Sequence, residues 1–542
     1  MGLPALFSLC FILIRSMSIL EFSMLLLLCL VIVVNQYLKI RRQYYSLPNW
    51  PVLRNLPSLI CNINRLNDWT VEILNGCATI LFNGPVFTGM EIVFTCNPQN
   101  VEYMMKTNFD EFNKGPHFAE IFDFLGNGMF VADGESWSEQ RKMAVTRFAS
   151  KKFQSFCSEK NDEVVTEGLV PVLEDAVKRG STIDLQEVFK RLAFDVTFAS
   201  VLGRNPGFLS VNFVENEFFE ALDTLTRVAF LRHCIPSLWW KVMRLLGLGW
   251  ERQYKHSWRV LDRHLTECIS AKKQDLTQGK KISDDLLATY MSSSTTSIGG
   301  DEENYCIDGN ENFLRDTALT FIFAGQDTFS SGLTWFFYML SKSPSVEAKI
   351  LEELKLVMDS NNNEEKKKKE LDLRKLKYLE AAILESMRLN PPVPIEHKSA
   401  KKKDMLPDGT IVGPGKIILF SMFAMGRMKW IWGDDCLDFK PERWIDIKTG
   451  NLKHEPSSKY PVFNVGPRAC LGKRMGMTVM KTVIAAVILD FHVEVVEGQS
   501  VRPVPSITLK MKDGLKAKTK LSVQTLEEQV RCWYLSTTGM PE

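Results

Sequence analysis

The feature that most constrains this chain is a cysteine, Cys470, which lies between a glycine-broken loop and a long apolar segment. The apolar segment runs from Gly472 to about Phe491 and predicts a helix. A thiolate at the start of that helix would face the positive end of the helix dipole and several free backbone N–H groups. Such a cysteine can bind a metal ion through one bond and leave the opposite metal face open. Taken alone, a cysteine before an apolar helix is more often a buried structural residue.

Four further positions at fixed spacing favour the metal-binding interpretation. The pattern Phe-x-x-Gly-x-Arg-x-Cys-x-Gly resembles the haem-binding loop of the cytochrome P-450 superfamily, in which the cysteine is the thiolate ligand of haem iron. The resemblance implies that Cys470 is the iron ligand. Gly466 then permits a backbone turn, and Gly472 lets the helix start lie close to the flat macrocycle. Phe463 shields the sulfur from water, and Arg468 pairs with a haem propionate.

A second apolar segment, Phe313–Leu340, predicts a long helix with an unusual centre. Glycine in a helix costs about 1 kcal/mol relative to alanine, and a buried acid beside a hydroxyl is a further cost unless both have partners. The resemblance identifies this centre with the oxygen-activation motif on the other side of the haem. It implies that Ala324 and Gly325 leave room for dioxygen. Thr328 hydrogen-bonds the bound oxygen, and Asp327 relays protons from solvent. The alternative is a core helix with a tolerated polar centre.

Two residues four positions apart, Trp137 and Arg141, share one helical face. Alone they would be an ordinary amphipathic surface pair, but the resemblance implies that they hold a haem propionate. Downstream, the prolines of Pro391–Ile395 force an extended segment, which borders the substrate pocket in the superfamily. His397, just after it, is either a further propionate contact or a mere edge residue.

A third motif predicts structure rather than bond-making. Glu385 and Arg388 are spaced three apart, a pair that is common on exposed helices and contributes only a few tenths of a kcal/mol there, about 0.2–0.5. The resemblance implies that they combine with Arg443 into a buried ionic triad, because buried charges must be mutually paired. The triad would lock the core beneath the haem loop.

The N-terminal region predicts a membrane anchor. No charged residue lies between Phe22 and Leu38, a length at the lower limit for spanning a bilayer. Lys39, Arg41 and Arg42 follow, and by the positive-inside rule they stay in the cytosol. A cleaved signal peptide is the alternative, but no small-residue cleavage site follows the apolar run. We therefore expect a single-pass protein of the endoplasmic reticulum membrane with its catalytic domain in the cytosol.

Composition excludes several classes. With 45% hydrophobic residues, 24% charged residues and a net charge of +2, the chain is ordinary and globular, which argues against nucleic acid as a partner. Twelve cysteines without CxxC pairs indicate reduced thiols rather than disulfides or a zinc site. The resemblance covers about Leu47–Lys520 and implies a mainly α fold with small β-sheets (α+β). The expected divisions are an anchor (1–45), a proline-rich hinge (46–58), one haem-thiolate monooxygenase domain (59–520) and a C-terminal tail (521–542).

Within the superfamily, the chain resembles plant enzymes that hydroxylate long-chain aliphatics, either alkanes at mid-chain or fatty acids. Several stretches carry this likeness, among them Leu81–Pro85 and Phe439–Trp444. The implied reaction inserts one atom of O2 into a C–H bond of a lipophilic substrate, with haem b as cofactor. The sequence has no dinucleotide-binding fingerprint, so electrons are expected from NADPH through a separate NADPH-cytochrome P-450 reductase. The alternatives are a haem-thiolate isomerase or dehydratase that needs no reductase, and an inactive membrane-anchored binding protein.

Overall fold

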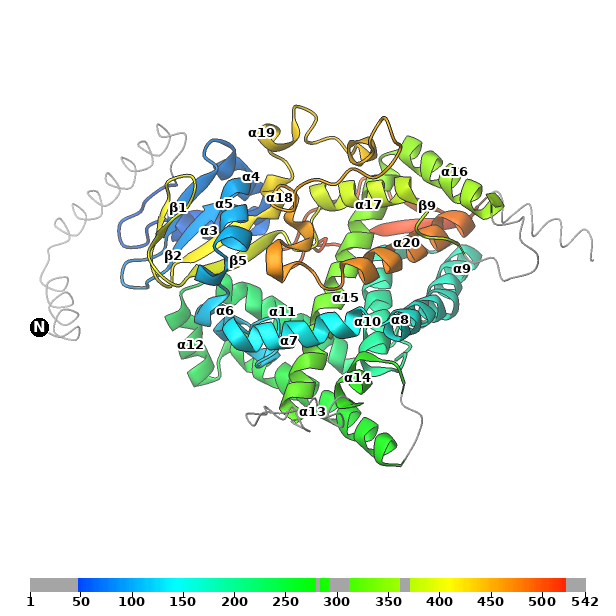
Figure 1. Ribbon diagram of the computed structural model, residues 1–542, viewed down its shortest axis with the longest axis horizontal. Coiled ribbons are helices and arrows are strands. Elements are labelled where there is room, and N and C mark those ends of the chain that lie inside the picture. Colours follow the sequence, from blue (N-terminus) through cyan, green and yellow to red (C-terminus); the bar gives the residue numbers. More distant parts are fainter. Residues whose placement is uncertain (1–46, 279–282, 293–310, 361–370, 523–542) are drawn as a thin grey trace, which may run out of the picture.

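The computed structural model describes residues 47–278, 283–292, 311–360 and 371–522 (Figure 1). The expected membrane anchor, residues 1–45, lies outside these ranges, and so does the expected tail, residues 521–542, apart from Leu521 and Ser522. Within them, no helix is both long and apolar enough to cross a membrane. The proline-rich segment is described from Leu47 onward and leads into α3 (Leu56–Asn62), which has a proline in its first turn, where the missing N–H is tolerated.

Helices make up most of the described chain, and they surround one long central helix, α15 (Glu311–Ser341) (Figure 1). The expectation of a mainly α fold with small sheets is therefore confirmed. The other helices are α4 (Leu66–Asn75), α5 (Pro98–Glu102), α6 (Gly115–Ile121), α7 (Gly134–Phe148), α8 (Lys151–Val164), α9 (Val170–Arg179), α10 (Leu185–Leu202), α11 (Glu217–Cys234), α12 (Ser237–Leu246), α13 (Gly249–Thr277), α14 (Leu286–Ser292), α16 (Pro344–Ser360), α17 (Lys377–Leu389), α18 (Met422–Met425), α19 (Lys429–Trp432) and α20 (Lys473–Asp490).

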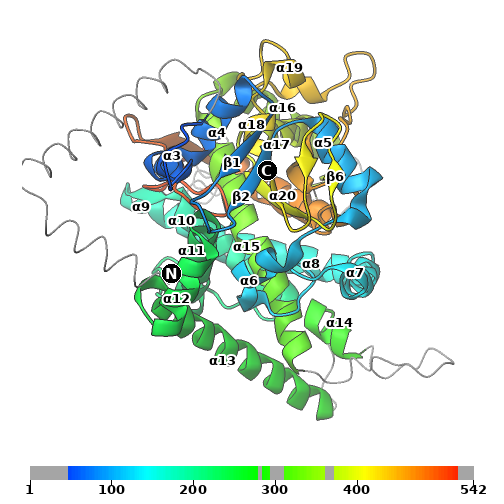
Figure 2. The same cartoon turned by 90° about the vertical axis from the view of Figure 1, so that its left-hand side faces the viewer.

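The strands form three small sheets. The five-stranded sheet has the order β1 (Thr79–Asn83), β2 (Glu91–Thr95), β8 (Ile417–Ser421), β5 (Ile395–Ala400), β3 (Phe112–Asn113). In it β2 and β8 are parallel, with Ile92 opposite Ile417, and the other neighbours are antiparallel. A three-stranded sheet joins β4 (Thr182–Asp184), β10 (Lys516–Leu521) and β9 (Phe491–Val495), and a two-stranded sheet joins β6 (Asp404–Met405) and β7 (Ile411–Val412). The largest sheet and α13 lie on different sides of α15 (Figures 1 and 2).

The two apolar segments singled out in the sequence are both helices close to the expected bounds. The segment expected at 313–340 is the 31-residue α15, and the one expected from Gly472 is α20. Because α15 packs against α10, α17 and α20, it is surrounded by protein, as a helix that is apolar on all sides must be.

The hydrophobic cores leave the middle of α15 free to form a site. The C-terminal half of α15, including Leu333 and Phe336, belongs to one core with α10, α17 and α20. The N-terminal half, including Leu319 and Ile322, belongs to a second core with α11 and α13. The turn at 324–328 belongs to neither core and faces a cavity instead.

Candidate functional site

The loop before α20 is fixed by its own backbone and by one close approach to the rest of the chain. The Cys470 N–H donates a hydrogen bond to the Phe463 carbonyl oxygen at 2.7 Å, and α20 begins at Lys473. Gly466 has a φ of +63°, and a Cβ atom there would lie 2.0 Å from the Met105 carbonyl oxygen. Only glycine fits this turn, so Gly466 determines the path of the loop.

A cavity of about 330 Å³ lies between this loop and the middle of α15. The loop supplies one wall, and α15 supplies the opposite wall. All the catalytic and cofactor-binding residues expected from the sequence, apart from Gly466, line it: Trp137, Arg141, Ala324, Gly325, Asp327, Thr328, Phe463, Arg468, Cys470 and Gly472. The fold thus brings three separate segments of the sequence to one enclosed space.

The Cys470 thiol faces this cavity rather than the outside of the molecule. Its sulfur is accessible from the cavity, yet the surrounding protein is close enough that burial raises the pKa of the thiol. A backbone hydrogen bond from Gly472 and the positive charge of Arg141 oppose that rise. A metal ion bound here would deprotonate the thiol outright. The sulfur is therefore placed as a single ligand on one wall of the cavity.

On the opposite wall, the polar residues of α15 make defined contacts. The Thr328 hydroxyl donates a hydrogen bond to the Ala324 carbonyl oxygen at 2.8 Å. A Cβ atom at Gly325 would lie 2.7 Å from the Thr197 hydroxyl oxygen on α10. Gly325 therefore allows α15 to pack closely on α10, a role that the sequence did not suggest.

Asp327 forms an ion pair that the sequence did not predict. Its Oδ2 atom lies 2.9 Å from the Lys510 Nζ atom and accepts a hydrogen bond from the Thr508 hydroxyl at 3.3 Å. Lys510 also pairs with Asp223 on α11 at 3.1 Å, and Asp223 contacts Lys190 on α10. Burial lowers the pKa of Lys510, but the charges of Asp327 and Asp223 outweigh burial and raise that pKa above its ordinary value. A chain of paired charges thus runs from the cavity wall to α10 and α11.

Comparison with known proteins identifies the family. A sequence model of the family Cytochrome P450 matches residues 84–519. The chain belongs to the cytochrome P450 family. This P450 is 40% identical to Alkane hydroxylase MAH1 of Arabidopsis thaliana over 474 residues, which cover 87% of the chain and 92% of that relative. It is 39% identical to Noroxomaritidine synthase of Narcissus aff. pseudonarcissus MK-2014 over 483 residues, 88% of the chain and 91% of the relative. It is 38% identical to Cytochrome P450 86B1 of Arabidopsis thaliana over 518 residues, 93% of the chain and 90% of the relative.

As a P450 the protein is a monooxygenase, an oxidoreductase of a family that uses haem and O2, takes electrons from a redox partner and acts on lipophilic substrates. The cavity fits a flat group lying against the loop. A Cβ atom added at Gly472 would meet no heavy atom within 4 Å, so the space beside the helix start is open. Cys470 borders the same space, and both features suit a haem held by its iron.

The cations beside the cavity fit a group that carries carboxylates. Arg468 donates to Asp133 at 2.7 Å, but its buried Nε atom has no hydrogen-bond partner within the described ranges. Lys398 on β5 is fully buried, and its Nζ atom lies 3.5 Å from the Phe112 carbonyl oxygen. Burial and the charges of Arg468 and Lys114 lower the pKa of Lys398 well below its ordinary value. Arg468 and Lys114 have carboxylate partners in Asp133 and Glu396, whereas Lys398 has none among the described residues, and a haem propionate would supply one.

Trp137 and Arg141, both on α7, touch the same loop. The Arg468 guanidinium lies 4.7 Å from the centre of the Trp137 ring, a cation–π contact. Arg141 donates from Nη2 to the Ala469 carbonyl oxygen at 2.5 Å. Both side chains are half-buried at the cavity, so the interpretation of an ordinary surface pair does not hold.

The three residues expected to form an ionic triad are in contact. Arg388 donates to Glu385 at 2.7 and 2.8 Å, and Arg443 donates to the same carboxylate at 3.3 Å. The Trp444 ring N–H adds a fourth bond at 2.9 Å. Glu385 and Arg388 are fully buried, so each charge depends on the other.

The sequence did not single out Lys114, Lys398 or Lys510, and nothing local marks them, because their partners come from distant segments. His397 is buried on β5, an inner strand of the five-stranded sheet, and it lines a second cavity rather than the one at Cys470. Lys398, one residue on, lies close enough to Arg468 for the two charges to interact.

Proposed function

We propose that this P450 hydroxylates long-chain aliphatic substrates, with Cys470 as the thiolate ligand of haem b. One atom of O2 enters a C–H bond, and the other leaves as water after two electrons and two protons are supplied. The observation that supports this most is the single cavity with Cys470 on one wall and Asp327 and Thr328 on the other. We further propose that NADPH supplies the electrons through a separate NADPH-cytochrome P-450 reductase.

The residues of the chain have separable tasks in this scheme. When bound, haem supplies the oxygen binding and redox chemistry. Cys470 anchors it, Phe463 shields the sulfur from water, and Arg468 with its neighbouring cations holds the propionates. The Thr328 hydroxyl, which now donates to the Ala324 carbonyl, can turn to donate into the cavity. Asp327 precedes Thr328 in the chain and is held by Lys510, and it supports proton delivery from the charged groups that lead outward.

The walls of the cavity support an aliphatic substrate. Away from the polar groups named above, the lining is apolar and includes Phe130, Phe323, Val393 and Ile507, which suits a chain without polar groups at the reacting end. One relative is named as an alkane hydroxylase, whereas another of nearly equal identity is named as a noroxomaritidine synthase. Sequence identity to these relatives therefore does not distinguish between their substrates, and the apolar lining of the cavity is the stronger argument for an aliphatic substrate.

We also propose that residues 1–45 anchor the enzyme in the endoplasmic reticulum membrane. The hinge at 46–58, the haem domain at 59–520 and the tail at 521–542 follow in the cytosol. Protection of only the N-terminal segment when intact microsomes are treated with protease would support this arrangement. Protection of the whole haem domain would contradict it.

The function is tested by turnover of alkanes, fatty acids and alcohols of matched chain length by the full-length protein with reductase and NADPH. We expect a hydroxylated product that requires both reductase and NADPH. Failure to oxidise any aliphatic compound by a haem-loaded preparation would refute the proposed substrate class. Turnover without reductase would instead indicate a haem-thiolate isomerase or dehydratase, and absence of haem would indicate a binding protein.

A further inference from the structure

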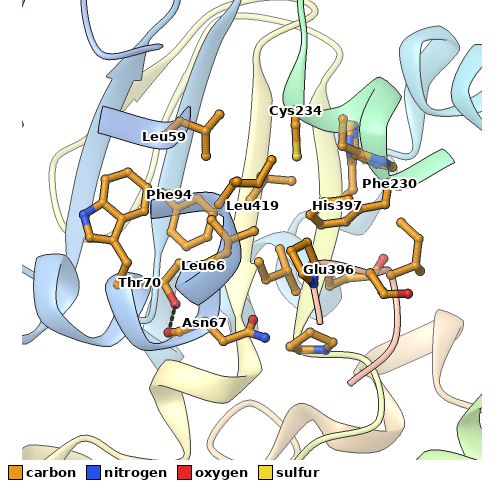
Figure 3. Close-up of a pocket in the computed structure, with 18 of the residues that line it drawn as sticks. Leu59, Leu66, Asn67, Thr70, Phe94, Phe230, Cys234, Glu396, His397 and Leu419 are labelled. Atoms are coloured by element: carbon orange, nitrogen blue, oxygen red, sulfur yellow. Dashed lines mark hydrogen bonds between the residues drawn. The ribbon is translucent and has the colours of Figure 1, made fainter. Parts of the chain in front are cut away.

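A second cavity, of about 140 Å³, lies between the five-stranded sheet, α4 and α11 (Figure 3). Its walls are largely apolar, with Leu59, Phe94 and Leu419 on one side and Phe230 on α11 across from them (Figure 3). Five residues line both this cavity and the one at Cys470: Lys114, Phe130, Val393, Glu396 and Ile507. The two cavities are therefore adjacent, with these side chains between them.

The second cavity contains a buried histidine without hydrogen bonds. His397 is 4% exposed, and neither of its ring nitrogens has a hydrogen-bond partner within the described parts of the chain. Its neighbours are rings: the Phe118 ring centre lies 5.2 Å away and the His233 ring centre 5.8 Å away. Buried polar groups in proteins are nearly always paired. A ligand in this cavity would supply the missing partner.

The contacts and burial of His233 and His397 determine which of their ring nitrogens can donate a hydrogen bond. His233 Nδ1 lies 2.9 Å from the Ala229 carbonyl oxygen, and a carbonyl can only accept, so Nδ1 carries the proton and Nε2 is an acceptor. Burial lowers the pKa of His233 to about 4 and that of His397 well below its ordinary value. Both rings are therefore neutral at pH 7. His397 then offers one N–H donor and one acceptor.

The charges around the cavity argue against an anionic ligand. Lys114 is already paired with Glu396, and at the exposed end Arg65 is paired with Glu72. The remaining charged residue in the lining, Asp68, is acidic. A carboxylate placed among the histidines would thus be buried without a cation, which is strongly unfavourable. A neutral hydroxyl, with one donor and two acceptor lone pairs, matches the two rings.

We propose that the second cavity binds a hydroxyl group of the substrate. His397 donates a hydrogen bond to the hydroxyl oxygen, His233 Nε2 accepts a hydrogen bond from the hydroxyl O–H, and the aliphatic chain extends past the shared lining residues toward Cys470. The substrate class is then a long-chain aliphatic alcohol, oxidised at a carbon remote from the hydroxyl it already carries. This proposal rests on the proposed function and specifies its substrate.

The test is a spectral binding titration of the purified, haem-containing full-length protein. The ligands are an alkane, a primary alcohol and a carboxylic acid of equal chain length. We expect the alcohol to bind about tenfold more tightly than the alkane, which corresponds to about one net hydrogen bond. His397→Phe keeps a ring of similar shape and should abolish this preference while leaving the alkane Kd nearly unchanged. His397→Gln keeps a donor and an acceptor and should retain part of it.

Phe230→Leu is the matched control, because it changes the apolar wall of the same cavity without removing a polar group. It should weaken alkane and alcohol binding equally. His397→Phe should leave the melting temperature unchanged, since the ring nitrogens have no protein partners to lose. An unchanged alcohol-to-alkane ratio in His397→Phe, tighter binding of the acid, or equal loss of all ligands with a lower melting temperature would overturn the proposal. If one of these outcomes were found while the enzyme still oxidised alkanes, the hydroxyl-binding site would be refuted but the proposed function would not.

Discussion

Replacing Lys510 with methionine should destabilise the enzyme by removing the partner of a buried carboxylate. The ion pair joins Lys510, whose side chain is 20% exposed, to Asp327, whose side chain is 7% exposed. After the substitution, the hydroxyl of Thr508 remains as a hydrogen-bond donor to Asp327, at 3.3 Å. A buried charge without a compensating cation is the main cost.

The size of the effect follows from burial. Breaking a buried pair by removing one partner costs about 3–5 kcal/mol. The second partner of Lys510, Asp223, is 37% exposed, so its loss adds only about 0–1 kcal/mol. Because Lys510 is itself partly exposed, we expect the lower end of the sum, about 3 kcal/mol. Adding Asp327→Asn to Lys510→Met removes the unpaired charge and should recover about half of this loss.

The dependence on pH has a defined sign. The pKa of Lys510 is higher in the folded than in the unfolded protein. Its contribution to the free energy of unfolding is therefore complete below the unfolded pKa of about 10.4 and is lost as the pH rises above the folded pKa. Burial alone would raise the pKa of Asp223, but Lys510 and Lys190 lower it. The stabilisation of that carboxylate is therefore present above about pH 4 and is lost at lower pH. The difference between the wild type and Lys510→Met should be constant from about pH 7 to pH 9 and should shrink at lower pH, where protonation neutralises an uncompensated buried carboxylate.

The assay is urea unfolding followed by circular dichroism at several pH values, with Lys512→Met as the control. Lys512 is an exposed lysine two residues away, and its substitution should change the free energy of unfolding by less than about 0.5 kcal/mol. If Lys510→Met is no more destabilising than Lys512→Met, or if Asp327→Asn does not rescue it, the pair does not hold the carboxylate as described.

Three further predictions concern other parts of the site. Thr328→Ala should lower the ratio of product to released peroxide by about 10²-fold, which is the low end of the rate effect of a positioned acid or base. An unchanged ratio would show that Thr328 takes no part in proton delivery. Gly466→Ala should lower both stability and haem content, because its Cβ atom would lie 2.0 Å from the Met105 carbonyl oxygen. Gly472→Ala should lower haem content alone. Equal melting temperatures for the two variants would contradict this. Glu385→Gln should lower the free energy of unfolding by about 3–5 kcal/mol, since it leaves the fully buried Arg388 without its carboxylate. A urea midpoint equal to that of the wild type would show that the triad does not stabilise the core.

The parts of the site that could be predicted from the sequence are those whose signal is local. The Cys470 loop, the centre of α15 and the Glu385–Arg388 pair are each a short motif of neighbouring residues, so each could be matched to a motif of the cytochrome P-450 superfamily. The pair of Trp137 and Arg141 was ambiguous, because four-residue spacing also occurs on exposed helices. Its position at the cavity depends on how α7 packs, which no local pattern encodes.

The remaining features depend on contacts between distant segments. Lys510 lies in an irregular stretch before β10 and meets Asp327 only through the tertiary fold. Lys398 and His397 are neighbours on β5 but lie at different places, one near Arg468 and the other in the second cavity. Adjacent residues of a strand point to opposite faces, so His397 does not lie on the side of β5 that carries Lys398, and a propionate contact for His397 stays a prediction. The membrane anchor remains a prediction from the sequence.

The central claim is that Cys470 is the haem ligand. It is tested most directly by the absorption spectrum of the reduced, carbon monoxide-bound protein in the wild type, in Cys470→Ala and in Cys436→Ala. Cys436 is a buried cysteine away from the cavity, so its substitution should keep the Soret band at the position typical of thiolate ligation. Cys470→Ala should abolish that band, and its survival in this variant would contradict the assignment.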